Sequence, residues 1–154
     1  MVVSDTADNE FMISTDKSKL DIAVVHNYLC NESYWAKNIT IDIVKKSIEK
    51  SFCFGLYHLN NQVGFARVIT DHATFGYLAD VFILENYRGK GLSKLMMKSI
   101  MFHPELQGLR AWMLATRDAH TLYAQFGFNA LDNPERFMRV SLFEEYPALE
   151  PSRG

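Results

Sequence analysis

The chain has little cysteine, and this scarcity excludes two classes of protein. Only Cys30 and Cys53 occur among its 154 residues, and their spacing fits neither a zinc site nor a disulfide scaffold. We therefore expect no metal site and two reduced thiols without a catalytic role. The chain also lacks an apolar run long enough to span a bilayer. Residues 1–10 are acidic, whereas a secretory signal begins basic and continues apolar. These observations predict a cytoplasmic protein that does not enter the membrane.

An overall excess of positive charge is also missing. The net charge is −2, so the protein as a whole is not expected to attract nucleic acid. One segment differs, because residues 86–104 contain no acid and carry four cations, Arg88, Lys90, Lys94 and Lys98. On a helix, the three lysines would share one face. A local basic cluster of this kind predicts a small polyanion as ligand.

The length and composition predict a single globular domain. With 154 residues, of which 48% are hydrophobic and 22% charged, the chain has enough apolar material for one core. We expect one domain over residues 1–154, with flexible ends at 1–10 and 145–154.

Apolar periodicity and turn residues predict an order of strands and helices. The expected strands are 11–14, 52–59, 62–70, 77–84, 111–115 and 137–143, and the expected helices are 20–29, 40–50, 92–103 and 118–126. The middle three strands have short connections and so form an antiparallel meander. The fold class is therefore α/β (α+β), with a mixed, mostly antiparallel sheet flanked by helices.

The most informative segment is the glycine-containing loop between the strand at 77–84 and the helix at 92–103. Its sequence is Arg88-Gly89-Lys90-Gly91-Leu92-Ser93. A strand that turns through two glycines into a helix leaves backbone N–H groups unpaired at the helix start, and these groups bind anions. The spacing is not that of a Walker loop, and the preceding meander excludes a Rossmann fingerprint. The loop alone predicts a phosphate site.

This loop resembles the acyl-CoA pyrophosphate loop of the GNAT superfamily of N-acetyltransferases, whose pattern is Arg/Gln-x-x-Gly-x-Gly/Ala. Arg88, Gly91 and Ser93 occupy the specified positions, and Ser93 departs from the usual glycine or alanine. Residues 114–128 resemble the other signature of that family, a strand and then a helix ending in Leu-Tyr-x-x-x-Gly-Phe, with Leu122-Tyr123 and Gly127-Phe128 in place. Together, the two motifs lie within residues 88–128.

The resemblance implies a sheet that splays around an acetyl-CoA cleft, with acetyl-CoA as co-substrate. Backbone amides of Val81, Phe82 and Ile83 would hold the pantetheine and the thioester carbonyl. The pyrophosphate would lie on the loop and the helix start, on Arg88, Gly89, Lys90, Gly91, Leu92, Ser93 and Lys94.

The resemblance also implies two catalytic residues. Tyr123 would be the general acid that protonates the leaving thiolate, since a phenol stays protonated at neutral pH. Asp80, a carboxylate within an apolar strand, is the first choice of general base, directly or through water. His120 and water are the other choices of base. Two structural readings remain open: Tyr123 as a core tyrosine, and Asp80 as the ion-pair partner of Arg67 or His120.

The acceptor is the least defined part of the prediction. Tyr34, Trp35 and Tyr77 would supply aromatic walls for an amine, and Asp71 would pair with its positive charge. We expect a small-molecule amine, although an amino acid, an antibiotic, a protein N-terminus or a lysine would also carry the reacting group. The strand expected at 137–143 is a candidate edge for a homodimer.

The expected activity is transfer of an acetyl group from acetyl-CoA to a primary amine by direct attack. The alternative is a non-catalytic acyl-CoA-binding sensor or interaction module, because fold does not fix function. A nucleotide-phosphate binder fits less well, since the sequence offers no evident pair of Mg²⁺-binding acids.

Overall fold

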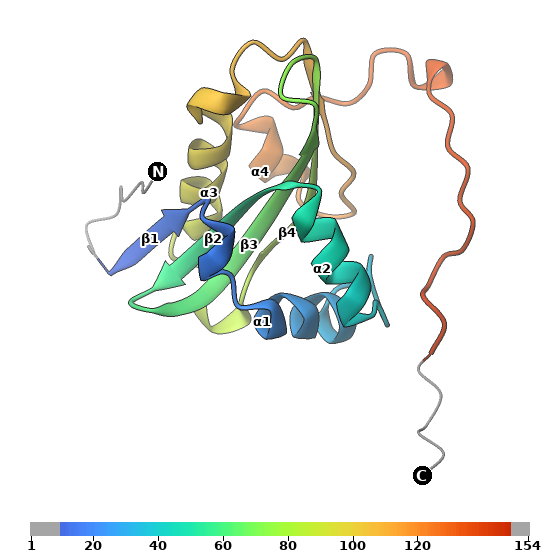
Figure 1. Cartoon of the computed structure of the whole chain (residues 1–154). Coiled ribbons are helices and arrows are strands. Elements are labelled where there is room, and N and C mark those ends of the chain that lie inside the picture. The colour runs from blue at the N-terminus through green and yellow to red at the C-terminus, as the bar shows by residue number, and fades with distance from the viewer. Residues whose placement is uncertain (1–9, 149–154) are drawn as a thin grey trace.

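The computed structural model describes residues 10–148, which form a five-stranded sheet flanked by helices (Figure 1). The strands follow one another across the sheet in chain order. Each successive pair from β1 to β4 is antiparallel, and β5 runs parallel to β4. The strands are β1 (Phe11–Ser14), β2 (Phe52–His58), β3 (Asn61–Thr70), β4 (Phe75–Ile83) and β5 (Ala111–Met113). The prediction of a mixed, mostly antiparallel sheet is confirmed.

Helices cover both faces of this sheet. They are α1 (Ile22–Asn27), which continues into a π-helical turn at Tyr28–Glu32, α2 (Ile41–Glu49), α3 (Leu92–Met101) and α4 (His120–Ala124). Side-chain caps mark where α1 and α2 begin. The Asp21 carboxylate accepts from the N–H of Val24, and the Thr40 hydroxyl accepts from the N–H of Ile43. Short 3₁₀ turns lie at Lys17–Lys19, Glu85–Tyr87, Pro104–Leu106 and Pro134–Arg136.

The alternation of side chains along the strands divides the apolar core in two. Phe54 and Leu56 of β2 belong to the cluster that contains Met96 of α3, whereas Cys53 belongs to the cluster that contains Val44 of α2. α3 therefore packs on one face of the sheet, and α1 and α2 pack on the other (Figure 1). Both cysteines are buried and free.

The two parallel strands separate soon after they pair. β4 and β5 are in register only from Phe75 opposite Ala111 to Tyr77 opposite Met113. The remainder of β4 has no β5 neighbour, and its register with β3 shifts near Asp80, which adopts a φ of 54°. A β-bulge with a non-glycine residue at positive φ re-aims a side chain and interrupts the ladder. The separation and the bulge together open the sheet beside Asp80.

Two sequence predictions about secondary structure are wrong. Residues 137–143 are described by the structure, and they form an exposed extended segment without strand pairing. α3 begins at Leu92, so Lys90 lies in the preceding loop and shares no helical face with Lys94 and Lys98. Residues 1–9 and 149–154 of the two ends expected to be flexible lie outside the described residues.

Candidate functional site

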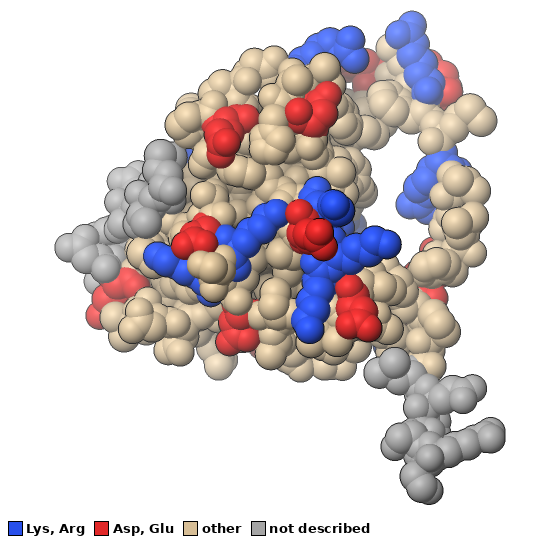
Figure 2. Space-filling view, viewed as in Figure 1, with Lys and Arg blue, Asp and Glu red and all other residues tan. Residues whose placement is uncertain are grey.

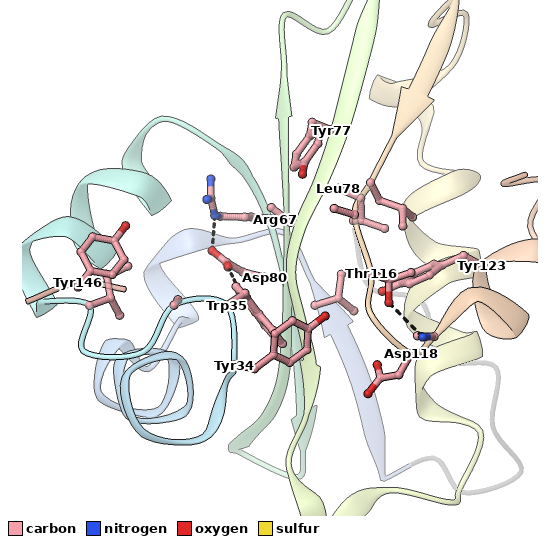
Figure 3. Close-up of a pocket in the computed structure, with 17 residues that line it drawn as sticks. Tyr34, Trp35, Arg67, Tyr77, Leu78, Asp80, Thr116, Asp118, Tyr123 and Tyr146 are labelled. Atoms are coloured by element: carbon pink, nitrogen blue, oxygen red, sulfur yellow. Dashed lines mark hydrogen bonds and ion pairs between the residues drawn. The ribbon is translucent and has the colours of Figure 1, made fainter. Parts of the chain in front are cut away.

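A cavity of about 330 Å³ lies where β4 and β5 separate (Figure 3). One wall is the stretch of β4 from Tyr77 to Val81, and the opposite wall runs from Leu114, just after β5, to Tyr123 on α4. Tyr34, Trp35, Arg67 and Tyr146 also line the cavity. The structure thus brings Asp80 and Tyr123, which are distant in the sequence, to one cavity.

Tyr123 is held on α4 with its ring against that of Phe128, at a centroid separation of 6.1 Å. Burial, with smaller contributions from the nearby Tyr34 and Asp118, raises the pKa of Tyr123 to about 12. The phenol therefore stays neutral and able to donate a proton across the physiological pH range. Ala119 is the N-cap residue of α4, and Asp118 before it lines the cavity.

Asp80 is engaged by two side chains, as Figure 3 shows. Arg67 Nε donates to Oδ2 at 2.6 Å, and Trp35 Nε1 donates to Oδ1 at 2.7 Å. The Asp80 side chain is only 9% exposed, so this ion pair is largely withdrawn from water. Each carboxylate oxygen keeps a lone pair for another donor. The structural reading of Asp80 as the partner of Arg67 is therefore observed, and the carboxylate still borders the cavity.

The loop that carries Tyr34 and Trp35 joins the two walls. Trp35 reaches Asp80 on β4, and the Tyr34 hydroxyl accepts from the backbone N–H of Arg117 at 3.0 Å. The Arg117 guanidinium carbon lies 3.9 Å from the centroid of the Tyr34 ring, a cation–π contact. Tyr34, Trp35 and Tyr77, three of the four expected acceptor residues, therefore border the same cavity as Tyr123.

Asp71, the fourth expected acceptor residue, is not at this cavity. Its Oδ1 accepts from the N–H groups of Ala73 and Thr74, and its Oδ2 accepts from the Thr74 hydroxyl. These hydrogen bonds, that of the Thr74 hydroxyl foremost, hold the pKa of Asp71 well below its usual value. Asp71 therefore builds the turn between β3 and β4, and the prediction that it binds the acceptor is corrected.

The glycine loop forms a second cavity, of about 200 Å³, at the start of α3. Gly89 and Gly91 have φ of +80° and +76°, and a Cβ built on either would meet no atom within 4 Å, so the space above the loop is open. Gly91 is the N-cap residue and provides no side-chain cap to the first N–H groups of α3. Lys94 and Ser93 line the same cavity. Open backbone donors with a nearby cation suit a phosphate group.

The side chains of Arg88 and Lys90, which were expected to hold the pyrophosphate, contact other parts of the protein. Arg88 donates from Nε to the carbonyl of Ile83 at 3.0 Å and from Nη2 to the Tyr28 hydroxyl at 2.9 Å. It thereby fastens the loop to β4 and to the π-helical turn. Lys90 Nζ lies over the rings of Phe11 and Tyr87, at 5.9 and 5.5 Å. Both side chains have partners within the protein, and the cavity beside them is also lined by Gly89, Gly91, Ser93 and Lys94.

Both cavities are lined by residues of β4 and α4. Val81 on β4 and Tyr123 on α4 line the first, and Ile83 and Leu122 line the second. The ring of Phe82 faces away and stacks on that of Tyr28 at 4.1 Å, buried in the other cluster. A long ligand with an anionic end could therefore follow β4 from the glycine loop to Tyr123.

Sequence reasoning missed some of the cavity residues. Thr116 and Tyr146 line the cavity, and the backbone carbonyl of Tyr146 accepts from Asn38 Nδ2 at 3.3 Å. Thr116 lies within the motif at 114–128 but not at one of its specified positions, and Tyr146 lies outside both motifs. No local pattern marks either residue. His120, the alternative base, borders a different cavity, of about 530 Å³, which it shares with Tyr123. Among residues 10–148, no group of His, Cys, Asp or Glu is arranged to hold a metal ion.

Comparison with known proteins identifies a family. The family model for the acetyltransferase (GNAT) domain matches residues 49–130, which include both cavities' walls on β4 and α4. A crystal structure from Xanthomonas campestris pv. campestris, assigned to the GNAT acetyltransferases, is 48% identical with a TM-score of 0.84, covering 86% of this chain and 93% of that one.

Two curated proteins are also similar. A Gibberella zeae protein named as an acetyltransferase is 31% identical over 138 residues, 75% of this chain and 77% of that protein. The ribosomal protein bS18-alanine N-acetyltransferase of Haemophilus influenzae is 34% identical over 79 residues, 47% of this chain and 52% of that protein. Acetyl-CoA is the acetyl donor of GNAT acetyltransferases, and it is bound in crystal structures of other members.

Proposed function

The chain belongs to the GNAT acetyltransferase family, and we propose that it transfers the acetyl group of acetyl-CoA to a primary amine by direct attack. One observation carries the proposal beyond family membership. Tyr123, a neutral phenol, and Asp80, a carboxylate, border one cavity at the point where β4 and β5 separate. An acid and a proton acceptor on facing walls are what amine acetylation from a thioester needs.

We assign the donor to the groove along β4. The backbone amides of the glycine loop and the α3 start would bind the pyrophosphate, with Lys94 beside them and Arg88 holding the loop in place. The pantetheine would follow Val81 to Ile83. The irregular β4 backbone at Asp80 supports this assignment, because a bulge leaves ladder groups free to bind a ligand.

In the proposed reaction, the nitrogen of the neutral amine attacks the thioester carbon. The carbon–nitrogen bond forms, the carbonyl π electrons move onto oxygen, and a β4 backbone amide stabilises that oxyanion. When the carbonyl re-forms, the carbon–sulfur bond breaks with its electron pair on sulfur, and Tyr123 protonates the thiolate. Before the attack, Asp80 takes one proton from the substrate ammonium, directly or through water, and passes it to solvent, which leaves the neutral amine. After the carbon–nitrogen bond has formed, the nitrogen gives up a second proton, which returns through water to the Tyr123 phenolate. No covalent enzyme intermediate is required.

The acceptor we propose is a small primary amine. The cavity of about 330 Å³ is walled by Tyr34, Trp35 and Tyr77, and the Asp80 and Asp118 carboxylates border it. Aromatic rings and carboxylates attract an ammonium group. The similar Haemophilus influenzae enzyme acts on a ribosomal protein's alanine, so an N-terminal alanine peptide is the second acceptor class to test.

A thiol-release assay with acetyl-CoA and a panel of amines tests this function. Small cationic amines and an alanine-ended peptide would be compared, with mass spectrometry of the acetylated product. We expect turnover of at least one amine. Acetyl-CoA binding without turnover of any amine would favour the non-catalytic acyl-CoA-binding alternative instead.

Two finer expectations remain proposals. No helix within residues 10–148 is long and apolar enough to cross a membrane, and the cytoplasmic location stays a prediction. Homodimer formation is likewise a prediction.

A further inference from the structure

A row of hydrogen bonds leads from the Asp80 carboxylate to the end of α2. The Arg67 guanidinium on β3 donates through Nε to Asp80 Oδ2 at 2.6 Å and through Nη1 to the Ser51 hydroxyl at 3.0 Å. The Ser51 hydroxyl in turn donates to the backbone carbonyl of Ser47 on α2 at 2.6 Å. Arg67 lies 13 positions from Asp80 and 16 from Ser51 in the sequence, so only the fold assembles this row.

The direction of each bond in the row is set by the protons available. A serine hydroxyl carries one proton and two lone pairs, and the proton of Ser51 is committed to the Ser47 carbonyl. Ser51 can therefore only accept from Arg67. The guanidinium is planar and donates in a fixed fork, so Nη1 on Ser51 and Nε on Asp80 together hold its plane at two points.

Burial gives this pair more weight than an ion pair on the surface has. Figure 2 shows one face of the molecule, on which basic and acidic side chains are interspersed at the surface, and solvent weakens such pairs. By contrast, the side chains of Arg67 and Asp80 are 17% and 9% exposed, and Ser51 is 7% exposed. Water does not readily replace a buried acceptor that is lost. Removing the Ser51 hydroxyl should therefore make the guanidinium reorient, and with it the carboxylate to which it is bonded.

The backbone at Asp80 makes the orientation of its side chain dependent on these contacts. Asp80 has a φ of 54° beside the register shift between Phe65 and Arg67. A non-glycine residue keeps such a conformation only where its surroundings fix it. Arg67 holds Oδ2, and Trp35 Nε1 holds Oδ1 at 2.7 Å. A donor on each oxygen thus sets one orientation for the carboxylate, at the cavity that Tyr123 also borders.

We propose that Ser51 and Arg67 are positioning residues of acetyl transfer, which hold the Asp80 carboxylate in the orientation that takes the proton of the substrate ammonium. The inference rests on the proposed function, because it acts through Asp80. Ser51 does not line the cavity, so its effect on the reaction passes through the Arg67 guanidinium. The end of α2 thereby contributes to the site without facing it.

A double-mutant cycle on kcat/KM for the amine tests the proposal, with Ser51→Ala and Asp80→Asn made singly and together. We expect Ser51→Ala to lower kcat/KM about tenfold in the native background, because the base is misplaced. Beside Asp80→Asn it should have no further effect, since two residues that act through one group are not additive. Ser51→Thr keeps the hydroxyl and should recover most of the activity that Ser51→Ala loses.

Ser99→Ala is the matched control. Ser99 is 5% exposed, and its hydroxyl donates to the carbonyl four residues earlier, that of Leu95, as the Ser51 hydroxyl does to that of Ser47. Deleting it reports the cost of losing a buried serine hydroxyl away from Arg67, and kcat/KM should stay close to the native value. Far-UV circular dichroism at the assay temperature would verify that each variant is folded.

Three outcomes would contradict the proposal, and they differ in what else they remove. An equal loss from Ser51→Ala in both backgrounds would mean a merely structural role, and it would leave the proposed function standing. Native kcat/KM in Asp80→Asn would remove Asp80 as the base and the positioning residues with it. If the native protein acetylates no amine, the proposed function itself fails.

Discussion

The two ends of the β4 groove are built in different ways. At the glycine loop, the groups proposed to bind the pyrophosphate are backbone amides, set by two glycines at positive φ and the start of α3. At the other end, side chains from four separate segments meet, with Trp35 and Arg67 on Asp80 and with Tyr123 on the facing wall. We infer that the first end provides affinity for acetyl-CoA and the second carries out the chemistry. A substitution at the first end should therefore change the Kd for acetyl-CoA, whereas a substitution at the second end should change kcat.

The largest effect is expected from Tyr123→Phe. Removing the proton donor should lower kcat by about ten- to ten-thousandfold, with little change in acetyl-CoA affinity. Tyr57→Phe is the matched control, because burial also raises the pKa of Tyr57 to about 12 and its buried hydroxyl has no hydrogen-bond partner. Steady-state kinetics would compare the two variants, and an unchanged kcat for Tyr123→Phe would remove Tyr123 from the acid role.

Asp80→Asn should lower kcat/KM by about ten- to a thousandfold if Asp80 accepts the proton of the amine. The variant also leaves the Arg67 guanidinium without its charge partner, at a cost of about 3–5 kcal/mol in unfolding free energy. Folding must therefore be verified by circular dichroism, and Asp80→Asn/Arg67→Gln provides a variant without the unpaired charge. The dependence of kcat/KM on pH should change at its acidic end. If activity and pH profile are both retained, His120→Ala becomes the next test of the base.

Gly91→Ala should raise the Kd for acetyl-CoA by about ten- to a hundredfold. The methyl group makes positive φ costly by about 1–2 kcal/mol and extends into the open space where an anion would bind. Gly108→Ala is the control, since Gly108 has a φ of +81° and an equally open Cβ position but lies outside both cavities. Isothermal titration would measure both, and equal affinities would show that the loop does not hold the donor.

The pH dependence of stability should be confined to alkaline solution for the buried tyrosines. Burial raises the pKa of Tyr57 and Tyr123 to about 12, so the folded state holds its phenol protons above pH 10, where the unfolded chain releases them. The stabilisation is complete below about pH 10 and is lost as pH rises toward 12, by at most about 3 kcal/mol for each tyrosine. Cys53, with its pKa raised to about 11 by burial, acts in the same direction. Urea midpoints at a series of pH values would show the decline, which Tyr57→Phe should reduce.

The smallest effect is expected from Asp71→Asn. Because Asp71 builds the β3–β4 turn and does not border the cavity, KM for the amine and kcat should stay within about twofold of the native values. A large rise in the amine KM alone would return Asp71 to the acceptor site.

The sequence predicted the backbone-built end better than the side-chain-built end, for a physical reason. The glycine loop and the helix that follows it depend on residues adjacent in the chain, so local patterns encode them. By contrast, Trp35 and Asp80 are 45 positions apart, and Tyr34 and Arg117 are 83 apart. Motif matching supplied Tyr123, and the apolar surroundings of Asp80 marked it as unusual, but their joint placement required the fold.

The wrong strand at 137–143 has a different cause. Its alternation is typical of a strand, but a strand exists only when it has a partner edge. The structure gives this segment no such edge, because residues 137–143 are exposed and pair with no strand of the described residues. The alternation therefore indicates only a local preference for extended structure. Whether a strand forms depends on a partner edge, which the residues of the segment do not encode.

The most direct test of the division between the two ends is to measure acetyl-CoA Kd and kcat in the same two variants, Gly91→Ala and Tyr123→Phe. We expect Gly91→Ala to raise Kd while kcat at saturating acetyl-CoA is retained, and Tyr123→Phe to lower kcat while Kd is retained. If Gly91→Ala instead lowers the saturated kcat and leaves Kd unchanged, or Tyr123→Phe acts only on Kd, the division of the groove into a binding end and a chemical end is wrong.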